Sequence, residues 1–303
     1  MTATRWLPAY VALAFVWGNS FLFIKVAVAS LHPVQVTLGR MVLGAATLLL
    51  ALALTRQRLP RDLPLWGHFA VVSVLLTTLP FTLFAYGEQH VSSVLAAIWN
   101  ATTPLCTLLF TLLLLREERP TRSAILGLAV GFVGVLVVLG VWRPMPGGAL
   151  AGSAACFAAA ASYGIGGVYM RRFVSGRPEP AVVLAAGQLA VGTVQVALLS
   201  VLLGVPPMPL DAPPRVWLSL VGLGAFGTGI AYLLLYRVIR VAGLTTVSSV
   251  TYLLPLVAAA SGLLLLDERL SWNQPAGAVI VLVAIALVQG VLRVPRRSAP
   301  VRV

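Results

Sequence analysis

The chain has 303 residues, of which 59% are hydrophobic and only 10% are charged. Its mean hydropathy of +0.98 excludes a soluble globule with a charged surface. The net charge of +13 does not indicate a nucleic-acid partner, because the arginines stand at the ends of apolar runs and are not grouped with aromatic residues on one surface. The composition predicts an all-α integral membrane protein.

About ten apolar windows approach the roughly 20 residues that a helix needs to cross a bilayer. They lie near residues 8–28, 34–54, 65–86, 92–114, 123–140, 149–170, 180–203, 214–236, 244–266 and 273–293. The first window is too long for the apolar core of a secretory signal and contains Trp17 and Asn19, so we interpret it as a retained helix. The expected fold class is therefore ten transmembrane helices.

The basic residues predict the orientation of these helices. With the N-terminus inside, most of the 21 lysines and arginines fall in inner loops or the C-terminal tail, whereas Arg143, Arg215 and Arg269 fall outside. The positive-inside rule then places both termini in the cytoplasm, and we expect a prokaryotic inner (plasma) membrane protein. The basic tail is expected to contact anionic lipid headgroups.

Two stretches of the chain repeat one pattern. SSVLAAIWNATTPLCTLLFTLLLLREER (92–119) and TTVSSVTYLLPLVAAASGLLLLDER (245–269) each place a proline in an apolar run and close on a Glu-Arg pair. WGNSFLFIK (17–25) likewise matches YGIGGVYMR (163–171). The repetition indicates two five-helix units, 1–145 and 146–303. Because five is odd, the second unit must be inverted in the membrane, as in many carriers that alternate between two open states.

The two repeated prolines predict helix kinks. Pro104 and Pro255 lack the N–H group that a helix interior needs, and each frees a carbonyl of the preceding turn. Polar residues stand just upstream of each proline, namely Asn100, Thr102 and Thr103 in one copy and Thr251 in the other. Their side chains either satisfy the freed carbonyls or bind substrate, and both interpretations stay open at this point.

Two basic residues fall inside predicted spans. Arg40 is expected to line a pathway, since an intramembrane charge usually faces a bundle interior or water. Lys25 either lines the same pathway or extends to the outer interface. Other polar and aromatic side chains at similar depth would form a mixed pocket for a small amphiphile, although each alone is compatible with core packing; they are Trp17, Asn19, Trp99, Tyr163, Gln188, Tyr232 and Tyr252.

Other classes of site have little support in the sequence. The acidic residues fall in loops or at helix ends, so no carboxylate is expected at mid-membrane depth. Glu118 and Glu268 are expected to cap helices or to pair with arginines, and Cys106 and Cys156 to be buried thiols. No metal or cofactor motif and no ATP-binding loop is recognisable, and we expect no enzymatic activity.

Taken together, WGxxFxxxK (17–25), Pro33 followed by Arg40, and the duplicated proline helix with its Glu-Arg end resemble the EamA family of the drug/metabolite transporter superfamily. The resemblance extends over residues 8–293. It implies ten helices in a five-plus-five plan and a secondary carrier with a central cavity, often an exporter of amino acids or related metabolites. The second half departs from the first, because it has no basic counterpart of Arg40 near residues 186–188.

The substrate class stays open among several alternatives. A nucleotide-sugar or phosphorylated-sugar carrier would use Lys25 and Arg40 to bind phosphate, and a multidrug or lipophile exporter would depend on neither. A polytopic membrane enzyme is the remote alternative. The expected partners are a small-molecule substrate and the lipid bilayer. We expect no nucleic acid and no obligate protein partner, and homo-oligomerisation stays open.

Overall fold

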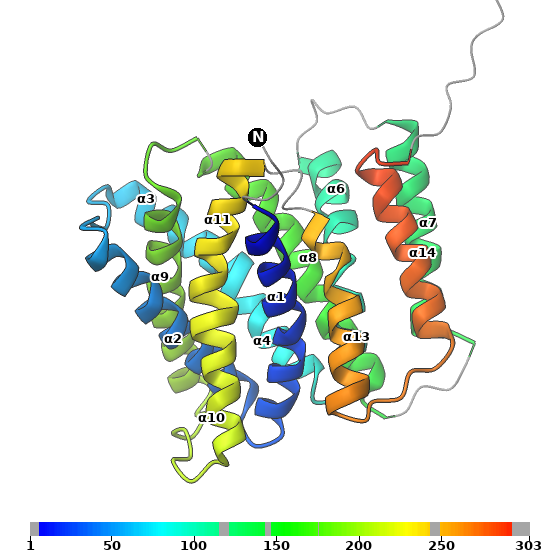
Figure 1. Ribbon diagram of the computed structural model, residues 1–303, viewed down its shortest axis with the longest axis horizontal. Helices are drawn as coiled ribbons and strands as arrows, with labels where there is room; N and C mark the ends of the chain where they lie inside the picture. The colour runs from blue at the N-terminus through cyan, green and yellow to red at the C-terminus, as the bar shows by residue number, and fades with distance from the viewer. Residues whose placement is uncertain (1–5, 115–120, 143–146, 175, 243–248, 293–303) are drawn as a thin grey trace, which may run out of the picture.

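The computed structural model describes residues 6–114, 121–142, 147–174, 176–242 and 249–292 (Figure 1). Every regular element in these ranges is helical, which confirms the predicted all-α class. The elements are α1 (Leu7–Val28), α2 (Pro33–Leu54), α3 (Leu63–Ser73), η2 (Val74–Thr78), α4 (Leu79–Gly87), α5 (Ser93–Asn100), α6 (Thr103–Leu114), α7 (Arg122–Leu139), α8 (Ala149–Phe173), α9 (Ala181–Leu202), α10 (Pro214–Val221), η3 (Gly222–Ile230), α11 (Ala231–Ala242), η4 (Ser249–Tyr252), α13 (Leu254–Leu265) and α14 (Asn273–Val288).

Eight helical segments of the described chain are long and apolar enough to cross a membrane, and α13 and α14 are shorter apolar helices. The segments occupy the predicted windows with small shifts at their ends. Two predicted windows, 244–266 and 273–293, correspond to the two shorter helices. The structure therefore confirms a membrane protein with several apolar helices.

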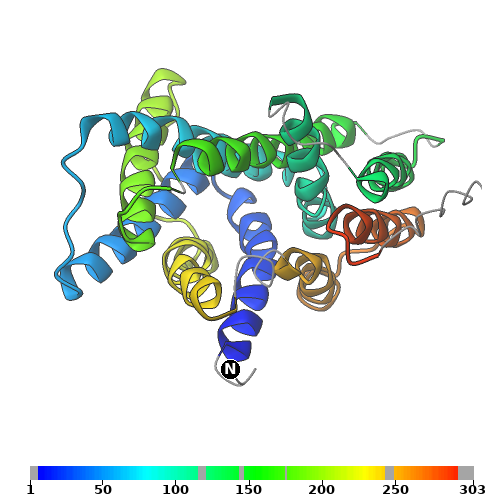
Figure 2. The ribbon, with the colours of Figure 1, turned by 90° about the horizontal axis from the view of Figure 1, so that it is seen from above.

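The helices run alongside one another, with α1 near the centre and α7 and α14 side by side at one edge (Figures 1 and 2). In Figure 1, α1 begins and α14 ends at the upper end of the molecule. The large buried cluster that includes Phe21, Phe84, Trp99 and Leu220 joins α1, α4, α5 and α10. The core thus connects the first half of the chain to the second.

Glycines allow several helices to approach closely. A Cβ atom on Gly127 of α7 would lie 2.8 Å from the carbonyl oxygen of Ala284 in α14. A Cβ atom on Gly224 of η3 would likewise lie 2.9 Å from the carbonyl oxygen of Arg40 in α2. Such contacts between backbones are typical of membrane helices, where small residues permit tight van der Waals packing.

Two of the long segments contain π-helical turns. The η2 segment separates α3 from α4, and the η3 segment separates α10 from α11. A π turn holds more residues than an α turn and is frequent at functional sites. In η3 the glycine-rich sequence GLGAFGTGI accommodates this conformation against α2.

The contact between α7 and α14 yields a stability prediction. Gly127→Ala should lower the thermal stability of the protein in detergent, because the new methyl group meets the α14 backbone; overpacking of this kind costs about 1–3 kcal/mol. Gly67→Ala is the matched control, since a Cβ atom there meets nothing within 4 Å and alanine has the better helix propensity. Equal melting temperatures for the two variants would contradict the described packing.

Candidate functional site

Arg40 of α2 is a charged side chain buried inside the bundle, with 8% of its surface exposed. Its Nε donates a hydrogen bond to the Thr228 hydroxyl at 3.0 Å. The guanidinium carbon lies 3.6 Å from the centroid of the Phe81 ring, a cation–π contact that gains strength away from water. The structure thus places the predicted intramembrane cation in the protein interior.

Thr228 fixes the position of this guanidinium. It belongs to the π-helical segment η3, and its hydroxyl donates to the Leu223 carbonyl at 2.9 Å. That bond leaves the lone pairs of the hydroxyl oxygen for Arg40. Gly44 of α2 makes room for the threonine, because a Cβ atom there would lie 2.9 Å from the Thr228 methyl group.

Side chains from three more helices surround Arg40. The phenols of Tyr163 (α8) and Tyr232 (α11) are within electrostatic range of its charge, and Gln188 of α9 lies beside the Tyr232 phenol. Gln188 is 2% exposed, and its amide nitrogen is enclosed without a hydrogen-bond partner in the described chain. Arg40, Phe81, Tyr163, Gln188, Thr228 and Tyr232 are called the Arg40 cluster below.

The Arg40 cluster has unused hydrogen-bonding capacity. Within the described residues, the guanidinium makes its one hydrogen bond through Nε. No hydrogen bond of its terminal nitrogens, Nη1 and Nη2, lies within the described residues. An arginine presents these nitrogens as a planar fork that matches a carboxylate or phosphate. The cluster is therefore equipped to bind an anionic group.

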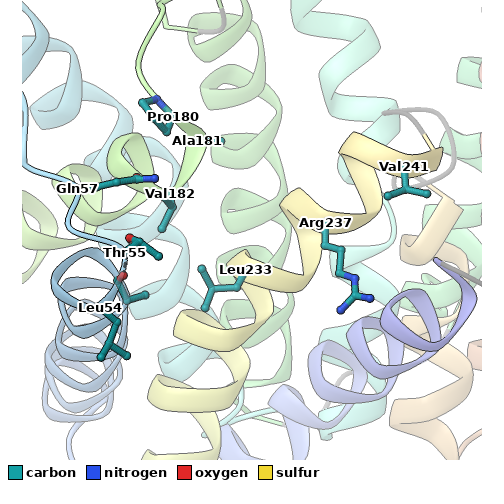
Figure 3. Close-up of a pocket in the computed structure, with 10 residues that line it drawn as sticks. Leu54, Thr55, Gln57, Pro180, Ala181, Val182, Leu233, Arg237 and Val241 are labelled. Atoms are coloured by element: carbon teal, nitrogen blue, oxygen red, sulfur yellow. Dashed lines mark hydrogen bonds between the residues drawn. The ribbon is translucent and has the colours of Figure 1, made fainter.

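A cavity of ≈ 750 Å³ opens at one end of the bundle (Figure 3). Its walls come from the end of α2, the start of α9 and the α11 helix; they include Leu54, Thr55, Gln57, Pro180, Ala181, Val182, Leu233, Arg237 and Val241. It lies at the end where α2 finishes and α9 begins. No member of the Arg40 cluster lines it, although α2, α9 and α11 contribute to both.

The helix is interrupted just before Pro104. The α5 helix ends at Asn100 and α6 begins at Thr103. Pro104 has no N–H group for the Asn100 carbonyl, and the Thr103 hydroxyl donates to that carbonyl instead, at 2.7 Å. The threonine therefore satisfies the backbone, one of the two roles considered for it. The Asn100 side chain is half-buried.

A similar interruption precedes Pro255. The η4 segment ends at Tyr252 and α13 begins at Leu254, and the Leu253 N–H donates to the Val250 carbonyl at 2.9 Å. Thr251 is half-buried in this break. The side chain of Tyr252 lies outside the described part of the structure.

Three further predicted site residues lie outside the Arg40 cluster. In α1, the Trp17 indole N–H donates to the Gly227 carbonyl at 3.2 Å, and the Asn19 amide oxygen accepts from the Ser261 hydroxyl at 2.7 Å. Both residues thus connect α1 to the second half of the chain. Trp99 is buried and lines a separate apolar cavity of ≈ 390 Å³ bordered by α5, α6, α7 and α8.

Lys25 binds main-chain oxygens near the end of α4. Its ammonium donates to the carbonyl oxygens of Glu88 and Val91 at 2.6 and 2.7 Å. A cation at this position complements the negative end of the helix dipole. Glu88 stands at a helix end as predicted, but its side chain is completely buried. Sequence analysis missed this burial, because a residue beside a short loop is normally hydrated.

Glu268 caps α5 from the other half of the chain. Its carboxylate accepts hydrogen bonds from the Ser93 N–H at 2.8 Å, the Ser93 hydroxyl at 3.0 Å and the Val94 N–H at 3.2 Å. These N–H groups have no partner inside the helix. Glu268 therefore has one of the two structural roles expected for it; its counterpart Glu118 lies outside the described residues.

Comparison with known proteins identifies relatives over nearly the full length. The EamA-like transporter family matches residues 4–140 and 150–289. The uncharacterized transporter YoaV of Bacillus subtilis is 23% identical over 89% of this chain and 92% of its own. The uncharacterized inner membrane transporter YedA of Escherichia coli K12 is 29% identical over 92% of this chain and 89% of its own. A solved structure with 19% sequence identity shares the fold, with a TM-score of 0.64 over 99% of this chain and 100% of that one.

The Glu268 cap yields a second stability prediction. Glu268→Gln should lower the free energy of unfolding by about 1 kcal/mol, because the amide replaces one acceptor with a donor that faces N–H groups. Asp211→Asn, an exposed acid in the loop between α9 and α10, is the control and should have little effect. Thermal unfolding in detergent measures both. A Glu268→Gln variant as stable as the control would show that the cap contributes nothing.

Proposed function

This chain belongs to the EamA-like transporter family, and we propose that it is a secondary carrier that exports amino acids or related small metabolites by alternating access. The observation that carries this proposal is the Arg40 cluster. The family and the names of the relatives indicate a transporter rather than an enzyme. The proposed partners are a small solute and the lipid bilayer.

A buried arginine with two uncommitted terminal nitrogens favours a solute that carries a carboxylate. A charge in a low-dielectric interior is costly unless an opposite charge is near. A carboxylate can accept two parallel hydrogen bonds from the guanidinium fork. The Gln188 amide nitrogen and the Tyr163 phenol offer further donors, and Tyr163 also packs beside Phe84 at 6.1 Å between ring centroids. Aromatic walls beside an anion site suit a modest, partly apolar metabolite.

Corresponding elements in the two halves support the proposed inverted repeat of residues 1–145 and 146–303. The helices α2 and α9 both have 22 residues. When their sequences are aligned from the first residue, Gln188 takes the position that Arg40 has in α2. The π-helical segments η2 and η3 occur in corresponding long segments. The α2 helix packs against η3, and α9 packs against η2. Repeated pairings of this kind suit a carrier in which the halves exchange roles.

The open cavity supports an alternating-access cycle. With both termini in the cytoplasm, as the distribution of arginines predicts, the ≈ 750 Å³ cavity faces the cytoplasm of the inner membrane. At the opposite end, Lys25 holds α4 and Glu268 holds α5. The breaks before Pro104 and Pro255 are points at which the helices can bend, because fewer backbone hydrogen bonds resist bending there.

The contacts of Lys25 weigh against a phosphorylated-sugar or nucleotide-sugar carrier. Its ammonium is committed to the carbonyls of Glu88 and Val91, so Arg40 is the basic member of the cluster. One guanidinium matches a singly charged carboxylate better than a doubly charged phosphate. A multidrug or lipophile exporter remains a second candidate, supported by the apolar ≈ 390 Å³ cavity beside Trp99.

Efflux from proteoliposomes tests the substrate class. Vesicles loaded with amino acids, sugars and nucleotide sugars should lose amino acids selectively, as read by mass spectrometry. Arg40→Gln should reduce this efflux by about tenfold or more, since a charged hydrogen bond is worth about 1.5–3 kcal/mol. Arg58→Gln, an exposed loop arginine, is the matched control, and protein-free vesicles give the background.

Other results of the efflux experiment would change the proposal. Loss of a nucleotide sugar while amino acids stay inside would contradict the proposed substrate. Selective loss of apolar compounds, unaffected by Arg40→Gln, would favour the lipophile exporter.

Cysteine labelling tests the proposed orientation. Thr55→Cys lines the cavity, Asp211→Cys lies in the loop between α9 and α10, and the native Cys106 and Cys156 are buried. A membrane-impermeant maleimide should label Thr55→Cys in inside-out vesicles and Asp211→Cys in right-side-out vesicles. The reverse pattern would mean that the cavity faces the outside and that the arginine distribution misled the assignment.

A further inference from the structure

Glu88 is an acid in an unusual environment. It follows the last residue of the Leu63–Gly87 span, and 0% of its surface is exposed. Both carboxyl oxygens are enclosed, and neither has a hydrogen-bond partner in the described chain. A buried carboxylate normally accepts several hydrogen bonds or pairs with a cation. Glu88 therefore lacks the contacts that hold a structural carboxylate in its charged form.

Charged and titratable groups on four parts of the chain interact electrostatically with Glu88. Lys25 of α1 and Arg40 of α2 favour its charged form, and Glu268 from the loop after α13 disfavours it. Cys156 of α8 lies within range of the same carboxylate. The Lys25 ammonium donates to the main-chain oxygens of Glu88 and Val91, and the Glu88 carboxyl oxygens have no hydrogen-bond partner in the described chain. Burial dominates and raises the pKa of Glu88 well above its ordinary value.

Glu268 shows by contrast what a structural carboxylate looks like at this end of the bundle. It accepts three hydrogen bonds from Ser93 and Val94, so these donors fix the position of its side chain. The two acids lie close enough to interact electrostatically, yet only one has donors. The difference assigns a structural role to Glu268 and leaves the role of Glu88 unexplained by the fold.

We propose that Glu88 is the proton-binding site of the carrier, and that its protonation is linked to anion binding at Arg40. This inference rests on the proposed function, because it concerns the same Arg40 cluster. Arg40 lies within electrostatic range of Glu88, and neither residue lines the open cavity. Both side chains are buried in the described state, with 8% of Arg40 and 0% of Glu88 exposed.

The linkage follows from the signs of the charges. The positive field of Arg40 favours ionised Glu88, and a solute carboxylate bound to Arg40 cancels part of that field. At a pH where Glu88 is still ionised, it then takes one proton from water as the solute binds, its carboxylate becoming a neutral carboxyl group. It returns the proton to water as the solute leaves. By thermodynamic reciprocity, protonation of Glu88 strengthens anion binding by the same factor.

Infrared difference spectroscopy tests the proton site without any transported solute. The purified full-length protein in detergent should show the carbonyl band of a protonated carboxyl group at about pH 6, the acidic end of the range used in the efflux test below, because burial disfavours the ionised form. Glu88→Gln should abolish that band, and Glu268→Gln, the matched control, should keep it. Glutamine preserves the size of the side chain and adds no buried charge. The proposal would be overturned if wild type and Glu88→Gln showed the same carboxyl band. It would also be overturned if wild type showed no such band.

Efflux under a pH gradient tests the linkage. For amino-acid-loaded proteoliposomes, lowering the internal pH from about 8 to about 6 should accelerate efflux by at least about fivefold, the lower range of typical couplings between sites. Glu88→Gln should remove this acceleration and Glu268→Gln should retain it. Unchanged acceleration in Glu88→Gln, or slower efflux from acidified wild-type vesicles, would contradict it.

The two measurements separate failure of this inference from failure of the proposed function. If no tested amino acid leaves the vesicles but the infrared band depends on Glu88, the substrate is wrong and the proton site stands. If amino acids leave and depend on Arg40 while Glu88→Gln changes neither band nor pH response, the carrier stands and Glu88 has no part in coupling.

Discussion

The position of Arg40 is the constraint on which the centre of this protein depends. A guanidinium inside a helical bundle loses its water, and the surroundings must compensate for that loss. Here the compensation comes from one hydroxyl, one aromatic face and the distant fields of other residues. This set holds the charge in place without neutralising it. A solute anion would complete the coordination.

The backbone near Arg40 is shaped to make this arrangement fit. Thr228 reaches the guanidinium from a π-helical segment, and the glycines around it let α2 approach that segment closely. Helix packing and the hydrogen bond from the Thr228 hydroxyl to the Leu223 carbonyl stabilise this irregular conformation. Substitution of the glycines would therefore disturb the charged site indirectly, through the distance between two helices.

Sequence reasoning located some parts of this site and missed others for identifiable reasons. Arg40 was evident because a cation inside an apolar run has few explanations, and its neighbours Tyr163 and Gln188 stood out as polar groups at similar depth. Thr228 was missed, since one hydroxyl in a glycine-rich run carries no pattern. Glu88 was missed because its burial depends on contacts with distant helices.

Other predicted site residues belong to the architecture in this conformation. Trp17 and Asn19 use their polar atoms to join α1 to η3 and α13. The Thr103 hydroxyl satisfies the carbonyl that Pro104 leaves open. In each case the sequence identified a polar group that needs a partner in the membrane, but the identity of that partner depends on which helices are neighbours.

The Glu268 cap also has a consequence for biosynthesis. Ser93 and Val94 receive their acceptor from a residue 175 positions later in the chain. At about 5–20 residues per second, the ribosome needs roughly 10–35 s to reach it. During that interval the start of α5 depends on the Ser92 side chain and on water. The first half of the protein therefore enters the membrane with this helix end incomplete, and its final structure is reached only after the second half has been synthesised.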